Sequence, residues 1–299
     1  MSDPKQLYEL NKRTIDIRFS REYLLGSRVL LYQDMLKHGN ISSLFQRFRK
    51  DWKTMQLRRD RNIVHNNLLS VNFDKPYSGD RIAVYTSIYG EYDSLCEPLY
   101  VDPNCDYYIL TNQEVPENSI WKKIEFEFPQ KINTNFLKNR YVKMFPHKIF
   151  SNYRYSLYID GNITVVSAVS LYLNEFAPVS GIAMHKHPAS GNLYDEIDAC
   201  LMTGKIKYEE SVQLKEKLIK EGFPQNFGMF ECNIILRDHK NEACSKIMEM
   251  WWNELLDGVK RDQLHFTYTL FKMGYKYSNI ALLGMNMNMN PMFIRGTHI

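Results

Sequence analysis

The sequence predicts an α/β domain of three layers with a mostly parallel central sheet, preceded by an N-terminal helical segment. From residue 80 onward, short β-branched apolar runs alternate with segments of helical periodicity. This alternation is typical of parallel strands joined by crossover helices. The chain has 299 residues, of which 44% are hydrophobic, so it can build one large core. Residues 5–62 instead have helical apolar spacing with basic residues between the apolar positions.

The N-terminal segment differs from the rest of the chain in charge. Residues 1–62 carry 14 Lys/Arg against 7 Asp/Glu, whereas the remainder has a small negative excess. Residues 38–40 form a break, and Ser42 or Ser43 can cap a following helix. From Asn66 to Asp80 the chain turns polar, with Pro76 and Gly79. We therefore expect a basic helical segment at residues 1–79 and the α/β domain at residues 80–299.

Two interpretations of the basic segment stay open. Its positive charge is interleaved with Phe45, Phe48 and Trp52, a pattern of helices that lie on an anionic membrane surface. The alternative is a helical hairpin packed on the α/β domain or on a second copy of the chain. The segment contains no recognised nucleic-acid-binding module, so no nucleic-acid partner is predicted.

The elements of the α/β domain follow one another in a definite order. We expect the β-branched run Arg81–Ile88 to be a strand that ends at Tyr89-Gly90, and Tyr155–Asp160 to be a buried strand. The predicted helix Asn135–Phe145 stops before Pro146. The predicted strands are Arg81–Ile88, Asp106–Thr111, Trp121–Phe126, Tyr155–Asp160 and one within Asn226–Arg237, and the predicted helices are Asn135–Phe145, Ser167–Phe176, Asn241–Leu256 and Arg261–Met273.

Several classes of protein are disfavoured by what the sequence lacks. The five cysteines are scattered and include no Cys-x-x-Cys pair, which indicates a reduced, cytoplasmic chain without a structural zinc site. There is no signal-like N-terminus and no apolar run of 18 residues. The sequence has no Gly-x-Ser-x-Gly, P-loop or Gly-x-Gly-x-x-Gly motif, which argues against a hydrolase elbow, an ordinary NTPase and a dinucleotide fold.

The segment Tyr158–Asn162 is the first candidate for chemistry. An apolar strand ends in Asp160, and Asn162 offers a second oxygen two residues later. Open α/β sheets bind ligands beyond the carboxyl ends of their strands. A carboxylate there suits a hard divalent cation, which would neutralise a departing diphosphate. The alternative is an ordinary Asp-Gly turn.

Two further segments carry polar or charged side chains that are candidates for ligand binding. Asp262 and Gln263 open a predicted helix, where the alternative explanation is helix-terminus electrostatics. Arg140 and Lys143 are three residues apart and therefore share a helix face. They can grip phosphate or sugar hydroxyls, although a solvated basic face is the alternative.

Taken together, the segments resemble a known family. The ordered set is similar to bacterial and plant glycosyltransferase-like domains (TOD/MUCI-like) long catalogued as a domain of unknown function. The resemblance spans roughly residues 80–299. It rests on Val84–Asp93, Arg140–Lys148, Ser156–Asn162, His187-Pro188 with Glu196, Trp251-Trp252 and Arg261-Asp262-Gln263.

A fainter similarity connects the chain to the retaining family-eight glycosyltransferases, which have the GT-A fold. It implies a GT-A-like domain, a UDP-sugar donor, and Mn²⁺ or Mg²⁺ held by Asp160, Asn162 and His298. It also implies that Asp262 and Gln263 face the donor sugar as catalytic residues. This sequence has Asn162 in place of the family's second aspartate, which should weaken metal binding.

The resemblance assigns a role to each remaining candidate. The loop Thr86–Asp93 would cradle the nucleoside, and Arg140 and Lys143 would face the donor. The donor-binding candidates are Thr86, Tyr89, Tyr92, Arg140, Lys143 and Asp160, and the acceptor-side candidates are His187 and Glu196. The implied partners are a nucleotide-sugar donor and a glycan or lipid-linked glycan acceptor in surface polysaccharide synthesis. The sugar transfer would take place in the cytoplasm or at the inner face of the membrane. Residues 1–62 would contact that membrane peripherally.

Two rival functions remain at this stage. A nucleotidyltransferase also uses a metal on an α/β sheet, but it releases pyrophosphate rather than a nucleoside diphosphate. A non-catalytic protein that binds a sugar or a nucleotide is the second rival, and Asn162 is the feature that favours it.

Overall fold

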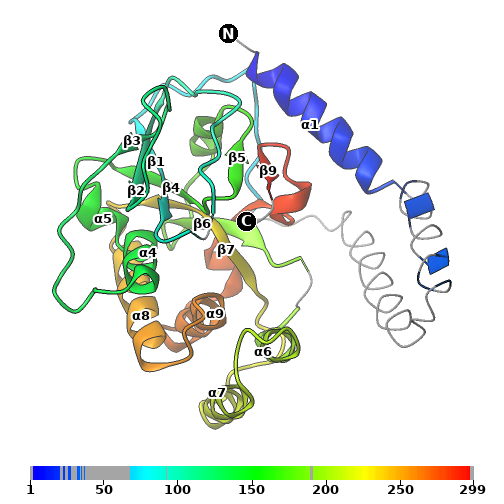
Figure 1. Cartoon of the computed structure of the whole chain (residues 1–299), viewed down its shortest axis with the longest axis vertical. Helices are drawn as coiled ribbons and strands as arrows, with labels where there is room; N and C mark the ends of the chain where they lie inside the picture. The colour runs from blue at the N-terminus through cyan, green and yellow to red at the C-terminus, as the bar shows by residue number, and fades with distance from the viewer. Residues whose placement is uncertain are drawn as a thin grey trace.

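The computed structural model describes residues 3–20, 68–91, 93–188 and 191–296, together with a few isolated residues between 23 and 37. Its centre is a seven-stranded sheet with the order β3-β2-β1-β4-β7-β6-β8 (Figure 1). All neighbouring pairs are parallel except the two that involve β7, so β7 alone runs against the others. The strands are β1 (Ile82–Ile88), β2 (Cys105–Thr111), β3 (Lys122–Lys123), β4 (Tyr155–Ile159), β6 (Ile182–Lys186), β7 (Phe230–Asp238) and β8 (Ala281–Gly284).

One face of the sheet is covered by helices. Trp251 and Phe266 pack with Tyr85 and Tyr158 of the sheet in one large core cluster. These aromatic residues are fully buried, and burial of such rings supplies much of the driving force for packing helices on a sheet. The helices are α4 (Asn135–Met144), α5 (Pro146–Ile149), α8 (Glu242–Asp257) and α9 (Gln263–Lys272).

The opposite face carries shorter elements. A second core cluster joins Val84, Leu157 and Ile234 of the sheet to Met287 and Phe293 near the C-terminus. The elements here are 3₁₀ turns η2 (Val169–Asn174) and η4 (Met287–Met289), the two-stranded sheet of β5 (Ile163–Val165) and β9 (Phe293–Arg295), and helix α1 (Pro4–Arg18). A further 3₁₀ turn, η3 (Tyr277–Asn279), directly precedes β8, and its Tyr277 packs against the first cluster.

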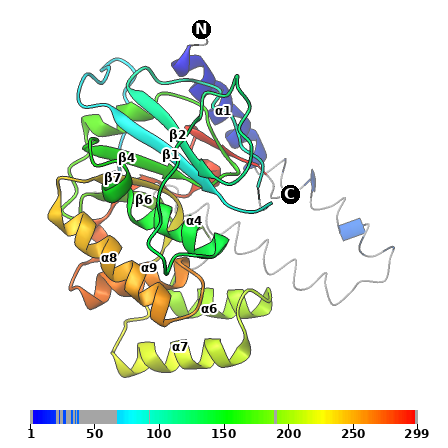
Figure 2. The same cartoon turned by 60° about the vertical axis from the view of Figure 1, so that its left-hand side comes forward.

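Two helices project from the end of the domain. Figures 1 and 2 show α6 (Leu193–Met202) and α7 (Tyr208–Lys220) beyond α9. A third, smaller cluster packs Leu193 and Leu218 of this pair against Leu264 and Tyr268 of α9. The pair is thereby attached to the helix that begins just after Asp262.

The structure confirms the predicted α/β class with its mostly parallel sheet, and the predicted strands β1, β2 and β4 and helices α4, α8 and α9 agree within two residues. The strand expected at Trp121–Phe126 is wrong in length, because only two residues pair at this edge. Phe126 and Phe128 leave the sheet and pack against Tyr141 of α4.

The helix expected at Ser167–Phe176 is a 3₁₀ turn over Val169–Asn174. Its bonds from Leu171 N to Ala168 O and from Glu175 N to Tyr172 O span three residues, which is typical of short, tightly wound segments. Strands β6 and β8 were not predicted from the sequence. Both are short, and β6 contains the polar residue His185, so neither has a distinctive apolar pattern.

Helix α1 packs on the α/β domain. The side-chain amide of Asn11 donates to the carbonyls of Pro291 (2.8 Å) and Phe293 (3.1 Å), and Ser167 Oγ donates to Pro4 O. Most of residues 21–67, including Phe45, Phe48 and Trp52, lies outside the described residues. Within the described part of the chain, no helix is long and apolar enough to cross a membrane.

The contact of Asn11 gives a test of this packing. Replacing Asn11 with alanine removes its two hydrogen bonds to the backbone, one of them buried and one partly buried. We expect the free energy of unfolding, measured by urea denaturation, to fall by roughly 1–3 kcal/mol. The exposed neighbour Lys12→Ala is the matched control and should have almost no effect. Equal stability of the two variants would show that α1 does not hold the C-terminal strand.

Candidate functional site

The carboxyl ends of the parallel strands meet at one edge of the sheet, and the predicted site residues gather there. β1 ends at Ile88, and β4 ends at Ile159 directly before Asp160. β7 runs in the opposite direction, so its first residues lie at the same edge, where Asn233 O accepts a hydrogen bond from Asp160 N (2.9 Å). Edges of this kind are the usual ligand sites of open α/β sheets.

A cluster of four charged side chains occupies this edge. Lys143 Nζ lies 2.6 Å from Asp262 Oδ2 and 3.8 Å from Asp160 Oδ1. Arg140 Nε lies 3.3 Å from the same Asp262 oxygen. The side chains of Lys143 and Asp262 are only 3% and 4% exposed, whereas that of Asp160 is 34% exposed. Asp160 is therefore the accessible carboxylate, and Asp262 is the buried counter-ion of the two cations.

The cluster keeps Asp262 ionised. Burial by itself would raise the pKa of this carboxyl, but Arg140, Lys143 and Arg261 outweigh burial and hold the pKa well below its usual range. Burial acts against the charge of Arg140 as well, yet Asp262, Tyr158 and Asp160 raise its pKa. Asp262 and Arg140 therefore stay charged over the physiological pH range.

Helix α4 positions both cations. Thr134 caps the helix by accepting a hydrogen bond from Leu137 N (3.2 Å), and Arg140 and Lys143 lie one turn apart on the same face. Asn139 ties the helix to β1 by donating to Ser87 O (2.6 Å), and Arg140 donates to the side-chain oxygen of Asn139. The predicted shared face is confirmed, but it points into the protein rather than into solvent.

Arg237 holds the other end of α4. This arginine is completely buried in β7, and its guanidinium donates to Lys143 O (2.7 Å) and to Tyr85 OH (2.9 Å). It has no ion pair with a carboxylate among the residues that the structure describes. A buried charge is costly, but the carbonyls at a helix C-terminus favour a cation. Arg237 thus fixes the backbone at Lys143, a role indicated in the sequence only by a lone arginine within an apolar strand.

Trp251 and Tyr158 complete the surroundings of the cluster. The indole nitrogen of Trp251 donates to Asp262 O (2.8 Å), which fixes the start of α9. The Lys143 ammonium lies 5.2 Å from the centre of the Tyr158 ring, and Tyr158 OH donates to Asp160 Oδ1 (2.8 Å). Tyr158 was not among the predicted site residues, although its position two residues before Asp160 places both on the same side of the strand.

The turn after Asp160 is closely packed. A Cβ atom on Gly161 would lie 2.7 Å from Ile88 Cγ1, so any larger residue between Asp160 and Asn162 would force the Ile88 side chain to shift. Asn162 Nδ2 donates to Gly296 O (3.2 Å), and Gly296 N donates to Asn162 O (2.7 Å). The C-terminal segment after β9 therefore runs beside the Asp160 turn.

The described residues supply an incomplete set of metal ligands. They contain no group of three His, Cys, Asp or Glu side chains that could hold an ion. Asp160 offers one accessible carboxylate, the amide nitrogen of Asn162 is bound to Gly296, and His298 lies outside the described residues. A hard cation needs about six oxygen ligands, so an ion here would depend on oxygens from a bound diphosphate.

A cavity of about 330 Å³ adjoins Arg140 and lies between the end of β1, the start of α4 and the loop before α9. Its volume is in the range of small-molecule sites. Tyr89 and Arg140 line it as predicted, but Thr86 is buried beneath it and Tyr92 lies outside the described residues. The lining residues are Ser87, Ile88, Tyr89, Asp93, Asn135, Phe136, Asn139, Arg140, Lys260 and Arg261.

The remaining candidates form a second cluster next to Asp262. Gln263 Nε2 donates to Glu196 Oε1 (3.2 Å), and His187 Nε2 lies 3.6 Å from Glu196 Oε2. These residues come from the start of α9, from α6 and from the chain after β6. Three residues that the sequence analysis selected from separate segments are thus in contact.

Glu231 is a further residue that the sequence analysis missed. It lies buried on β7 and accepts a hydrogen bond from Met287 N (2.8 Å). Burial raises its pKa to about 7, and the nearby charge of Asp160 adds to the shift. In the sequence it is one polar residue within an apolar strand, a signal that does not separate a site residue from a structural one.

Comparisons with known proteins identify a family that the chain matches. A family model described as TOD1/MUCI70, glycosyltransferase-like domain, matches residues 94–298. The solved structures with remote similarity include WbbM, a bifunctional glycosyltransferase (12% identity, TM-score 0.44, 70% of this chain and 40% of that chain). Mouse xyloside xylosyltransferase 1 is 11% identical with a TM-score of 0.39, and the match covers 70% of this chain and 85% of that chain. The glycosyltransferase GlyE of Streptococcus pneumoniae TIGR4 is 10% identical with a TM-score of 0.37, and the match covers 69% of this chain and 45% of that chain. A search of curated proteins found no match.

The buried ion pairs predict a specific loss of stability. Asp262→Asn leaves Lys143 and Arg140 without their counter-charge, so we expect the free energy of unfolding at pH 7 to fall by about 3–5 kcal/mol. The matched control is Asp198→Asn, which disrupts an exposed pair with Lys215 and should cost less than about 1 kcal/mol.

The difference between wild type and Asp262→Asn should also depend on pH. Because the pKa of Asp262 is depressed in the folded state, its contribution is complete above the unfolded value of about 4 and is lost as the pH falls below it. Urea denaturation at pH 7 and pH 3 measures this. A difference that stays constant would show that Asp262 is not an ionised partner of the two cations.

Proposed function

Since this chain belongs to the TOD1/MUCI70 glycosyltransferase-like domain family, we propose that it transfers a sugar from a nucleoside-diphosphate donor, with UDP as the expected nucleotide, to a glycan acceptor. The observation that carries the proposal is the cluster at the carboxyl edge of the sheet. There the accessible carboxylate of Asp160 lies beside Arg140 and Lys143, next to a cavity large enough for part of a nucleotide.

Glycosyl transfer requires stabilisation of the leaving group. As the bond to the anomeric carbon breaks, negative charge builds up on the departing diphosphate, and fixed cations near it lower the barrier. Arg140, Lys260 and Arg261 line the cavity and supply such cations. Lys143 lies behind Arg140, where its contact with Asp262 keeps it in place. We assign the diphosphate to the cationic side of the cavity and the nucleoside to the side of Tyr89 and Phe136.

We further propose that Mn²⁺ or Mg²⁺ assists this step when bound. Asp160 would hold the ion, Asn162 and His298 would contribute where they reach it, and diphosphate oxygens would complete the shell. The ion would supply Lewis-acid stabilisation of the leaving group. Because only one carboxylate is accessible, the ion and the nucleotide should bind together.

The environment of Asp262 favours retention of the anomeric configuration. An inverting enzyme needs a general base for the acceptor hydroxyl, and an effective base has a pKa near the working pH. Asp262 is a poor base, because Arg140 and Lys143 hold its pKa well below the usual range. We therefore assign Asp262 to positioning the two cations, with Gln263, Glu196 and His187 on the acceptor side. A lipid-linked glycan at a membrane surface is the acceptor class that a peripheral contact of residues 1–62 would suit.

The donor and the metal are tested together by calorimetric titration of UDP. We expect UDP to bind more tightly with Mn²⁺ than in EDTA, on the order of tenfold, and Mn²⁺ affinity to rise by the same factor with UDP. Asp160→Ala should abolish this coupling and His298→Ala should weaken it, while the exposed control Asp74→Ala should leave it unchanged. Equal UDP affinity with Mn²⁺ and in EDTA would remove the metal from the proposal and leave the cations alone to bind the diphosphate.

The reaction type is tested on the product. We expect a screen of UDP-sugars to give UDP release and a glycoside whose NMR anomeric signal shows the donor's configuration. Asp262→Asn, assayed at a temperature where circular dichroism shows it folded, should lose activity by at least about a hundredfold, because the cations lose their fixed positions. An inverted product would exclude the retaining mechanism. Turnover of Asp262→Asn near the wild-type rate would exclude Asp262 from the site, and pyrophosphate release would indicate a nucleotidyltransferase.

A further inference from the structure

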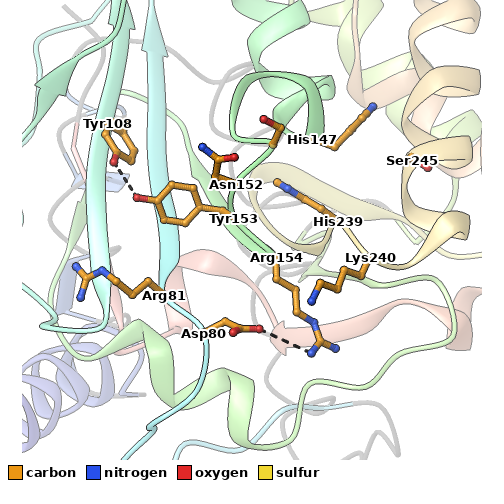
Figure 3. Close-up of a pocket in the computed structure, with 11 residues that line it drawn as sticks. Asp80, Arg81, Tyr108, His147, Asn152, Tyr153, Arg154, His239, Lys240 and Ser245 are labelled. Carbon is orange, nitrogen blue, oxygen red and sulfur yellow. Dashed lines mark hydrogen bonds and ion pairs between the residues drawn. The ribbon is translucent and has the colours of Figure 1, made fainter.

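A second and larger cavity, of about 840 Å³, lies at the opposite, amino edge of the sheet (Figure 3). Arg81 and Arg154 directly precede β1 and β4, and His239 follows β7, which ends at this edge. Asp160 is six residues from Arg154 along an extended strand, a separation of about 20 Å at roughly 3.3 Å per residue. None of the residues predicted from the sequence lines this cavity, so it is distinct from the proposed transfer site.

The two arginines of the cavity are held in ion pairs. Arg81 makes two hydrogen bonds of 2.7 Å to the carboxylate of Asp106. Arg154 lies 3.1 Å from Asp238 and 3.8 Å from Asp80. The lining holds three cations, Arg81, Arg154 and Lys240, and one carboxylate, Asp80. Asp106 and Asp238 do not line the cavity, but their direct contacts with Arg81 and Arg154 offset most of the charge that these two arginines would offer to an anion.

The two histidines of the cavity add no charge. Burial is the main cause that lowers the pKa of His147 and of His239 to about 4, and the positive charge of Arg237 lowers both further. At neutral pH both rings are uncharged and act only as hydrogen-bonding groups. His239 is held by a 2.7 Å hydrogen bond between its Nε2 and Ser156 Oγ.

The side of the cavity away from His239 carries aromatic rings and polar groups that hydrogen bonds hold in place. The hydroxyls of Tyr108 and Tyr153 are 2.8 Å apart, and Tyr153 OH donates to Asp106 Oδ2 (2.9 Å). Figure 3 shows the two tyrosines and Asn152 on one side of the cavity and His239 and Lys240 on the other. Donors, acceptors and partly exposed aromatic rings therefore face a single space.

We propose that this cavity binds an uncharged oligosaccharide. A sugar presents many hydroxyls that both donate and accept hydrogen bonds, and it has C–H faces that pack on aromatic rings. Because Arg81 and Arg154 are already paired with carboxylates, the cavity favours such a ligand over a phosphate or a nucleotide, and its volume accommodates more than one sugar ring. Binding of a saccharide at this cavity does not depend on the proposed transfer reaction. Where both hold, the bound saccharide is a part of the acceptor distant from the reacting end.

The test uses the full chain on an array of neutral and acidic oligosaccharides, followed by calorimetric titration of the strongest neutral binder. Asn152→Ala and Tyr153→Phe each remove one polar group at the cavity, so we expect each to weaken binding about three- to tenfold. Asn118→Ala replaces an exposed asparagine elsewhere and should have no effect. Asp160→Ala should bind the saccharide as wild type does, which separates this site from the transfer site.

Salt dependence gives an independent measurement. Affinity for an uncharged ligand should be the same in 50 mM and 500 mM NaCl, whereas a ligand held by charge would bind more weakly as salt rises. Three results would overturn the proposal. These are no binding to any neutral oligosaccharide, binding to acidic saccharides alone, and binding that Asp160→Ala abolishes while the cavity variants leave it intact.

Discussion

The ion pair of Lys143 with Asp262 is the constraint on which the carboxyl edge of this molecule depends. Both side chains are almost completely buried, and removing such charges from water costs several kcal/mol each. Their 2.6 Å contact joins the last turn of α4 to the residue that opens α9. A buried pair of this kind is often no more stable than a pair of well-packed apolar residues, although removing one partner alone is costly. Its main role is therefore to fix where the charges are.

The surrounding contacts serve the same purpose. Arg237 holds Lys143 through its carbonyl, and Trp251 holds Asp262 through its carbonyl, so both partners are fixed by backbone as well as by side chain. Arg140, the more accessible cation, then projects from a rigid helix into the cavity. A preorganised cation needs no rearrangement when charge develops on a leaving group, which is the main requirement for electrostatic catalysis.

The two aspartates of the site differ in burial and in the residues that surround them. Asp262 is surrounded by cations and almost completely buried, whereas Asp160 receives a hydrogen bond from Tyr158 and is one-third exposed. The Asp160 turn is also held from a distance. Gly296 pairs with Asn162, β9 pairs with β5, and Asn11 of α1 binds the backbone of the same C-terminal segment. The N-terminal helix therefore contributes to the position of the accessible carboxylate through three successive contacts.

The sequence by itself determined the layers of the fold and the strand that ends at Asp160, because hydrophobic periodicity and the Asp-Gly turn are local properties. It also selected Arg140, Lys143, Asp262 and Gln263, since residue type and helix spacing can be recognised without coordinates. Only the tertiary structure decided that Asp262 is the buried partner of both cations rather than an exposed helix cap. The same holds for Arg237, whose partners on α4 and β1 are at least 90 residues away in the chain. Burial and long-range pairing arise when distant segments pack together, and no local pattern records them.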